Sequence, residues 1–467
     1  MKRSRNTALA AVALGCLLFS NVGSRADILR QQDLESSVRK SYPPLLAAYQ
    51  EINQANADVL SAKGKFDTRL KGRAENNSLG YYENRVVDVG VEQPLRWGGA
   101  DLFGGWRIGQ GTFPVYEGKY DTRSGGEYRV GARLPLLQDR TIDNRRADLK
   151  KTAIGQQSAT LSVEQQRLSI MNSALQRYWL WVAAGNRLSI ARGVLQTAVS
   201  RQALLELGAS SGQLPAIEAV DNRRAILQRE GQVVEATRSL QMAALDLSLF
   251  YRDAAGQPIV PTEAELPPGV EGSPAEDPAS IESSIALAQE KRPEAQRIAT
   301  QRSAAEVDLQ LAKNQKKPDL DLTTLFTSEK GTSQTVRRGP QEFRAGVVFE
   351  LPLQRRQAEG RIQAAQARIE QYKRREQFAK DTIREEVQDA VSALTTTSQR
   401  LKLAQQELQV TQQLEAAERT KFDLGEGTLF LLNLREQATL DAATKNVTAL
   451  ADRQRAVSVY RYSIADF

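Results

Sequence analysis

Histidine is absent from this 467-residue chain, and cysteine occurs once, as Cys16. Without histidine the chain has no Ser-His-Asp or Cys-His catalytic arrangement and no histidine-ligated metal site. A single cysteine forms neither an internal disulfide nor a cysteine cluster that binds metal. Methionine occurs only three times, so we expect no methionine relay for copper. Most familiar enzyme chemistries are therefore excluded, and no motif implies a cofactor.

An excess of charge of one sign is also missing. The chain carries 63 Lys and Arg against 56 Asp and Glu. Four of the bases lie in residues 1–26, which hold no acid, and the remainder balance at 59 against 56. Recognition of nucleic acid through its phosphates requires a clustered positive surface. We therefore expect no nucleic-acid partner.

The N-terminus has the three parts of a secretory signal peptide. Residues 2–5 are basic, Thr7–Phe19 are apolar, and Ser24-Arg25-Ala26 provides the small residues that signal peptidase reads. The apolar stretch is shorter than the about 20 residues that span a bilayer. The sequence therefore predicts a signal peptide over residues 1–26.

Two other interpretations of this segment are weaker. A short N-terminal anchor helix would also use the apolar stretch. Lipidation at Cys16 would fit Gly15-Cys16, but Leu17-Leu18-Phe19 continue the apolar core past the cysteine. No later segment reaches the about 18 apolar residues of a transmembrane helix. A secreted chain of this kind is periplasmic, extracellular or an outer-membrane β-barrel.

The sequence contains an internal twofold repeat. Its halves are related by an offset of 250 near their beginnings and of 217 further along. The matched pairs include Pro43 with Pro293, Lys63 with Lys313, Pro135 with Pro352, Gly208 with Gly425 and Phe250 with Phe467. The difference between the offsets places 33 extra residues in the first half, between Lys63 and Pro135.

The repeat divides the chain into a first unit, residues 27–250, and a second unit, residues 279–467. Residues 251–278 between them hold six of the sixteen prolines and are expected to form an extended connector. Each unit begins with a helix, over Gln32–Gly64 or Pro278–Lys317. Strands and a long helical stretch follow in both.

The long helical stretches cover Asp139–Tyr251 and Gln354–Phe467. Glycines interrupt each stretch once, at 208–212 and at 425–427, so each is expected to be two antiparallel helices. Apolar residues in the second stretch recur at alternating steps of three and four, the pattern of a coiled coil. The segment from Asp139 to Leu207 would extend roughly 100 Å as one helix. Such helices suit a tube or stalk.

The strand regions alternate between apolar and charged or small residues, as in Val87, Val89 and Val91. The first unit has four candidate strands and the second has two; those of the first are 66–73, 85–94, 101–113 and 127–136. In a soluble sandwich the apolar face would form a core. In an outer-membrane barrel it would meet lipid, and the charged face a wet lumen. The signal peptide and the coiled-coil helices favour the barrel.

With these features the sequence resembles the outer membrane efflux protein family, the TolC-like channels. The resemblance covers nearly all of residues 33–467. Its carriers are the repeat, the helix starts at Tyr42-Pro43 and Arg292-Pro293, the closing segment Lys421–Glu436, and three prolines at expected strand–helix junctions. These prolines are Pro94, Pro135 and Pro352.

The resemblance implies a mainly α fold with β structure. Long antiparallel coiled-coil helices would form a periplasmic tunnel, and strands of a homotrimer would combine into one outer-membrane β-barrel in contact with lipid. The implied function is the passive exit duct of a tripartite efflux pump or type I secretion system. Its partners would be a periplasmic adaptor (membrane fusion) protein and an inner-membrane pump. No enzymatic activity is implied.

Two sets of site residues follow from the resemblance. Adaptor docking falls on the tips of the helical hairpins, Leu207-Gly208 and Leu424-Gly425, where the glycines would in any case allow the turn. Some channels of the family close with an aspartate ring just after the second tip, where this chain has apolar residues. A hydrophobic constriction at Phe430 and Leu431 could gate by dewetting. Glu218 and Asp221 could supply a charged ring instead, or all four could lie on solvated helix faces.

The strand number and the cargo stay open. Six strands in each copy would give 18 in a trimer, where the family barrel has 12, unless the extra pair forms an extracellular or equatorial hairpin. Drugs, metal ions, polypeptide and polysaccharide all fit a duct of this kind. A periplasmic coiled-coil adaptor or scaffold is the alternative function, and a secreted enzyme is the weakest.

Overall fold

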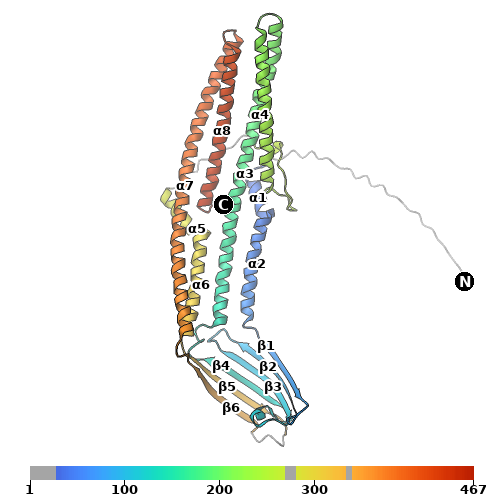
Figure 1. Cartoon of the computed structure of the whole chain (residues 1–467), viewed down its shortest axis with the longest axis vertical. Helices are drawn as coiled ribbons and strands as arrows, with labels where there is room; N and C mark the ends of the chain where they lie inside the picture. The colour runs from blue at the N-terminus through green and yellow to red at the C-terminus, as the bar shows by residue number, and fades with distance from the viewer. Residues whose placement is uncertain (1–27, 269–279, 333–338) are drawn as a thin grey trace, which may run out of the picture.

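The structure is a computed structural model that describes residues 28–268, 280–332 and 339–467. The expected signal peptide 1–26, with Cys16, lies outside the described residues, and so does the end of the expected connector. The described chain forms a long helical shaft with a β-sheet at one end (Figure 1). None of the helices in these described ranges is long and apolar enough to cross a membrane.

The sheet contains six antiparallel strands that pair in the order of the sequence. They are β1 (Arg69–Asn77), β2 (Asn84–Pro94), β3 (Asp101–Gly111), β4 (Glu127–Pro135), β5 (Asp319–Glu329) and β6 (Gln341–Glu350). The sequence predicted four strands in the first unit and two in the second, and this distribution is confirmed. The alternative of a separate hairpin is wrong, because β2 and β3 pair with each other and with the neighbouring strands β1 and β4.

The strand register sorts the side chains onto two different faces. One face, called the apolar face here, exposes large apolar side chains on all six strands: Leu70, Val89, Val91, Leu102, Tyr128, Val130, Phe326, Phe343, Val347 and Phe349. The other, the polar face, carries ion pairs across neighbouring strands, such as Lys71 with Glu92 and Arg133 with Asp101. A row of exposed apolar side chains needs a non-aqueous environment or a partner.

Each unit begins with two helices rather than the single helix that the sequence predicted. In the first unit α1 (Gln31–Ser41) is followed by α2 (Pro43–Gly64), and in the second α5 (Ile281–Lys291) by α6 (Pro293–Gln315). The residue between them is extended, because a following proline disfavours the helical conformation and removes a backbone N–H. The prolines start the second helix of each pair, as the resemblance implied.

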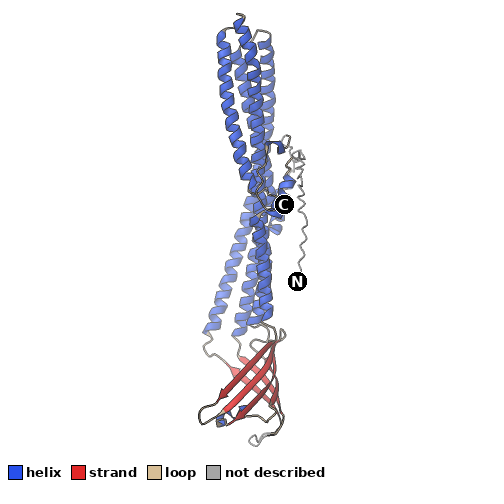
Figure 2. Ribbon diagram, turned by 90° about the vertical axis from the view of Figure 1, so that its right-hand side faces the viewer, coloured by secondary structure: helices blue, strands red, loops and turns tan. Residues whose placement is uncertain are grey.

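Two hairpins of long helices make the shaft, as predicted. They are α3 (Asn144–Ser210) with α4 (Ala216–Ser248), and α7 (Arg356–Asp423) with α8 (Leu429–Ser463). The 67 residues of α3 extend roughly 100 Å. Helices α3 and α7 run the length of the shaft, with α2 and α6 beside them near the sheet and α4 and α8 at the far end (Figures 1 and 2). Two 3-10 turns, η1 (Val115–Tyr120) and η2 (Glu263–Glu265), lie outside the shaft helices.

The main core lies at the middle of the shaft, between the helices near the sheet and the helices at the far end. Leu34 and Val38 of α1 pack there with Met171 and Trp181 of α3 and with Leu247 of α4. A second cluster joins α5, α7 and α8 around residues such as Val387, Leu394 and Tyr460. These two clusters fix α3 and α7 at the middle of the shaft.

Every layer of the molecule is an open row of elements. The far layer has the order α4, α3, α8, α7, and the layer near the sheet has the order α2, α3, α6, α7. The sheet follows with β1 at one edge and β6 at the other. In all three layers, the described chain leaves both ends of the row uncovered.

Candidate functional site at the helical tips

The first tip is built around two glycines with different tasks. Gly212 has φ +73°, which favours glycine, and makes the turn. Gly208 lies inside α3, and a β-carbon there would come within 2.7 Å of the Leu214 side chain. Its carbonyl accepts bonds from the N–H groups of Gln213 (2.9 Å) and Leu214 (3.1 Å). Gly208 therefore makes room for Leu214 and binds the loop that follows it, but it does not itself form the turn.

The second tip has the same turn at a different place in the sequence. Gly425 has φ +79°, and the N–H groups of Glu426 and Gly427 bond the carbonyl of Lys421 at 2.9 and 3.1 Å. The Thr428 side chain then accepts from the N–H of Leu431 and starts α8. By these bonds Gly425 corresponds to Gly212, four residues from the match at offset 217. The match of Gly208 with Gly425 therefore does not hold at the tips, because Gly208 lies before its turn and Gly425 lies within its turn.

Apolar side chains are exposed at both tips. Leu207 of α3 and Ile217 of α4 are 67% and 68% exposed, and Leu424 and Phe430 of the second tip are 70% and 72% exposed. We call these four residues the tip surface. Exposed large apolar residues gathered at the end of a molecule are typical of an interaction site.

The expected gate residues lie on two different helices. Leu431 is half-buried on α8, beside the exposed Phe430, while the flanking Leu429 and Leu432 are buried inside the tip. Glu218 is half-buried in the first turn of α4, where a carboxylate is favoured by the helix dipole.

Asp221 is bound to the other hairpin. It accepts from Asn433 Nδ2 of α8 at 3.4 Å and from Arg224 Nε at 3.1 Å. The structure therefore connects Asp221 of α4 to α8.

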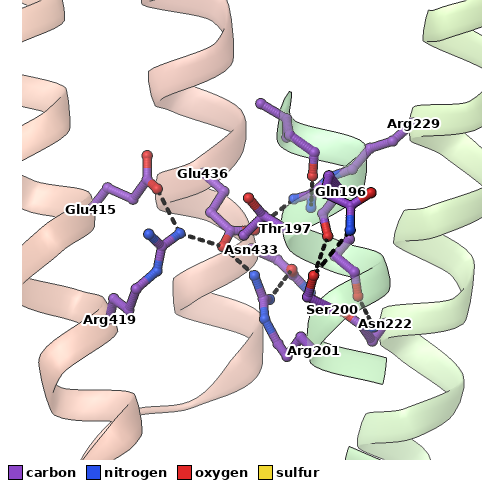
Figure 3. A network of polar contacts seen from close by, with 12 residues as sticks. Gln196, Thr197, Ser200, Arg201, Asn222, Arg229, Glu415, Arg419, Asn433 and Glu436 are labelled. Carbon is purple, nitrogen blue, oxygen red and sulfur yellow. Dashed lines mark hydrogen bonds and ion pairs between the residues drawn. The ribbon is translucent and has the colours of Figure 1, made fainter. Parts of the chain in front are cut away.

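A buried carboxylate close to the tips connects all four helices (Figure 3). Glu436 of α8 is only 2% exposed. Its Oε2 accepts from Arg229 of α4 at 2.7 Å, and its Oε1 accepts from Arg419 of α7 at 3.1 Å and from Arg201 of α3. We call Glu436 and these three arginines the Glu436 cluster. It holds the two hairpins to each other through a single side chain.

Each arginine of the cluster makes one further contact. Arg201 also donates to Asn433 Oδ1 at 3.1 Å, Arg229 to the carbonyl of Val194 at 3.1 Å, and Arg419 to Glu415 at 2.8 Å. Burial lowers the pKa of Arg201, and Glu436 acts in the opposite direction. Charge-assisted hydrogen bonds of this kind are about twice as strong as neutral ones.

Glu436 is the last residue of the closing segment Lys421–Glu436, and the sequence alone predicts no role for it. A signal was present, because Glu436 continues the buried face of α8 that starts with Leu429 and Leu432, at steps of three and four. Leu440 follows four residues later on the same face. An acid at such a position needs a buried partner, but the three arginines come from distant parts of the sequence.

The three junction prolines divide into two kinds. Pro135 ends β4 before the loop to α3, and Pro352 follows β6 before α7, as expected. Pro94 is not at a strand–helix junction. It ends β2 before a turn that contains Gly98 and Gly99, both with positive φ, and leads into β3. The expectation was wrong there because the extra hairpin repeats the end of a strand without a helix after it.

No protein-family model and no curated protein matches the sequence. Solved structures do resemble the fold. The outer membrane channel CmeC of Campylobacter jejuni has a TM-score of 0.63 and 16% identity, over 99% of this chain and 94% of that chain. A membrane protein from Pseudomonas aeruginosa has a TM-score of 0.65 and 15% identity, over 98% and 96%. The MtrE outer membrane channel of Neisseria gonorrhoeae, in its open state, has 0.62 and 15%, over 93% and 88%. The chain therefore has the fold of outer-membrane channels, and the resemblance is confirmed at this level.

Proposed function

We propose that three copies of this chain assemble into a passive exit duct that crosses the outer membrane and the periplasm. One observation carries the proposal: each layer of the protomer is an open row with two uncovered ends. Rows of this kind become closed walls when identical copies join head to tail around an axis. The similarity in fold to outer-membrane channels supports the same conclusion.

In the sheet, closure would join β6 of one copy to β1 of the next. A strand edge has unpaired N–H and C=O groups, and a closed barrel removes such edges. Six strands from each of three copies would give the 18-stranded barrel that the sequence left open. The apolar face would contact lipid, and the polar face would line the lumen.

The helical layers offer surfaces for the same closure. On α4, Val220, Leu227 and Val234 are all more than 60% exposed and recur every seven residues. On α7, Leu403 and Val410 form a similar exposed pair, also seven residues apart. A seven-residue repeat of apolar side chains is the pattern of a helix packed against another helix. We infer that α4 of one copy packs against α7 of its neighbour.

The tip surface would contact a periplasmic adaptor protein, which would link the duct to an inner-membrane pump. The duct itself needs no catalytic residue, only a wet lumen and an end that closes. The Glu436 cluster favours one arrangement of the two hairpins, and an adaptor that binds another arrangement more tightly would shift the equilibrium toward it. Leu207→Gln combined with Leu424→Gln should then abolish copurification of an adaptor while trimers still form. Undiminished copurification would contradict docking at the tips.

Imaging of the purified protein tests the proposed function. The protein is extracted with detergent from an outer-membrane fraction and examined by negative-stain electron microscopy. We expect a threefold particle well over ~100 Å long, because α3 alone has that length. A compact, detergent-independent particle in the soluble periplasmic fraction would contradict the duct and favour a periplasmic coiled-coil scaffold.

A further inference from the structure

We propose that residues 112–126, which connect β3 to β4 and are called the outer loop here, fold over the polar face and narrow the duct at its outer end. The outer loop would set the size of the largest solute that passes between the lumen and the outside. This inference rests on the proposed function, because only a closed barrel gives the polar face a lumen. It adds a second constriction, at the opposite end of the molecule from the tips (Figure 1).

The position of the outer loop follows from Gly109. This residue of β3 belongs to the polar face, since it lies an even number of positions from Asp101 and Arg107 and therefore points to the same side of the sheet. A β-carbon on Gly109 would collide with the carbonyl oxygen of Tyr120. The N–H of Thr122 donates to the carbonyl of Gly109 at 3.0 Å, and the N–H of Gly109 donates to the Thr122 hydroxyl at 3.0 Å. The bonds to Thr122 lie in the plane of the sheet and hold the outer loop beside β3, and the backbone at Tyr120 lies directly on the polar face.

Tyr120 extends the contact toward the edge of the sheet. Arg73 of β1, Asp88 of β2 and Arg107 of β3 are cross-strand neighbours in one row. The Tyr120 ring lies with its centroid 5.1 Å from the guanidinium carbon of Arg107 and 5.7 Å from that of Arg73. Guanidinium groups within about 6 Å of an aromatic ring attract it. The ring thus holds the outer loop across three strands.

The outer loop also covers an ion pair. Arg107 and Glu127 are paired at 2.5 Å with side chains 10% and 6% exposed, and Arg107 donates to the carbonyl of Lys119 at 2.9 Å. Nearer the helices on the same face, the paired Lys71 and Glu92 are 64% and 27% exposed. A buried ion pair that loses its surroundings is costly. The covered pair therefore favours the inward position of the outer loop.

The far end of the outer loop is attached to β5. The N–H of Arg123 donates to Glu329 Oε2 at 3.3 Å, and the N–H of Gly125 donates to the carbonyl of Lys330 at 2.9 Å. Val115 and Tyr116 at the start of η1 are 98% and 79% exposed. The outer loop is thus anchored from β1 to β5, and these two side chains stay uncovered.

The extra residues of the first half explain why such a constriction is useful. Strands β2 and β3 and the outer loop all lie between Lys63 and Pro135, where the first half is longer by 33 residues. Because barrel diameter grows roughly linearly with strand number, 18 strands give a diameter about 1.5 times that of 12. The same insertion that widens the barrel would then fill part of it. Acids and bases alternate in the row beneath the loop, so we expect selection by size rather than by charge.

Cysteine reporters test the constriction without involving the tips. Val348→Cys places a thiol on the polar face, closer to the helices than the outer loop, at a position 57% exposed. Leu79→Cys is the rim control, in the turn between β1 and β2, at 94% exposure. Cys16 is the chain's only cysteine, so each reporter is the single thiol once residues 1–26 are removed. Intact cells are treated from outside with a small maleimide and with poly(ethylene glycol) maleimides of increasing length.

Loop variants are combined with the Val348→Cys reporter. Gly109→Ala inserts the colliding β-carbon, and Thr122→Val removes the hydroxyl that bonds Gly109, which keeps the test valid if the first variant fails to assemble. Gly118→Ala is the matched control within η1, because a β-carbon there meets nothing within 4 Å. We expect the parent reporter to react with the small maleimide but not with the longest reagents. Both loop variants should shift the size limit upward, and Gly118→Ala should not.

The outcomes separate the constriction from the duct. If Val348→Cys with an unaltered outer loop reacts with the longest reagents as readily as Leu79→Cys, the constriction is overturned while the duct stands. The same holds if assembled Gly109→Ala and Thr122→Val trimers keep the parent's size limit. If Leu79→Cys reacts and Val348→Cys reacts with no reagent in any variant, the polar face lines no lumen. The duct and the constriction are then both wrong.

Discussion

At the scale of single residues, Glu436 is the side chain that connects all four long helices near the tips. A carboxylate has about four lone-pair sites, and here they receive guanidinium groups from three helices. The attraction depends on the low exposure of the group, since water would weaken each ion pair. Removal of the negative charge would leave three positive side chains facing one another, two of them buried.

We therefore expect Glu436→Gln to loosen the tips. Breaking a buried ion pair by removing one partner costs about 3–5 kcal/mol. Hydrogen exchange should become faster in α3 around Arg201 and in α4 around Arg229. Glu415→Gln is the matched control, because the Glu415 carboxylate is paired with Arg419, whose side chain is 43% exposed. Equal exchange in the two variants would show that the Glu436 cluster does not hold the hairpins together.

We expect the free energy of unfolding to depend on pH through Tyr178, which lies at the middle of the shaft. Its hydroxyl donates to the carbonyl of Leu29 at 3.0 Å, and burial raises the pKa of Tyr178 from 10.0 to about 12. The folded state thus keeps the proton that the unfolded state releases first. The associated stability is fully present below pH 10 and is lost as the pH rises toward 12, by about 2–3 kcal/mol.

The expected result is a fall in the thermal unfolding midpoint between pH 10 and 12. Tyr178→Phe keeps the ring and cannot titrate, so its midpoint should fall less over the same interval. Parallel curves for the two proteins would contradict the role of Tyr178.

At the scale of elements, the two faces of each strand meet different surroundings. Val347 and Val348 are neighbours on β6 with similar exposure, 62% and 57%, but they lie on opposite faces. In the proposed duct one contacts lipid and the other lines the lumen.

We expect Val347→Arg to impair assembly in the membrane and Val348→Arg to be tolerated. Arginine on the lipid face costs about 2–4 kcal/mol at the bilayer midplane, whereas a lumen position is wet. Gel mobility of unheated outer-membrane samples would reveal the fraction of assembled trimer. If the two variants behave alike, the apolar face does not contact lipid.

The sequence predicted the ends of helices and turns well where a nearby proline or glycine determines them. It predicted less well the contacts that depend on residues far apart in the sequence. Proline and glycine marked the starts of α2 and α6 and the two hairpin turns, because their conformational limits act within a few residues. The same local signal misled at Pro94, since a strand end looks alike before a helix and before another strand. The partners of Glu436 could not be predicted, because their meeting depends on how the hairpins pack.

At the scale of the whole molecule, the proposed assembly requires that each of the three layers contact the same layer of the next copy. The exposed stripe on α4 is the clearest part of such an edge, since its three residues Val220, Leu227 and Val234 are separated by two heptad steps. Burial of one leucine is worth about 1.5–3 kcal/mol, and a threefold assembly repeats that gain three times.

Leu227→Glu should therefore lower the fraction of trimer that chemical cross-linking detects at a given protein concentration. Gln228→Glu is the matched control, because it adds the same charge on the adjacent, exposed position outside the stripe. A trimer fraction unaffected by Leu227→Glu would mean that α4 does not form the contact between copies.

The unbroken course of α3 gives the molecule leverage. The core around Trp181 divides this helix into an arm that runs to Ser210 at the tip and a longer arm that runs to Asn144 near the sheet. The tip arm, with the helices bound to it, measures roughly 44 Å at 1.5 Å per residue, so a tilt of about 10° at Trp181 would move its end by roughly 8 Å. A small rotation at Trp181 would thus become a displacement of several ångströms at the tip. The tip is the end at which the proposed duct would open.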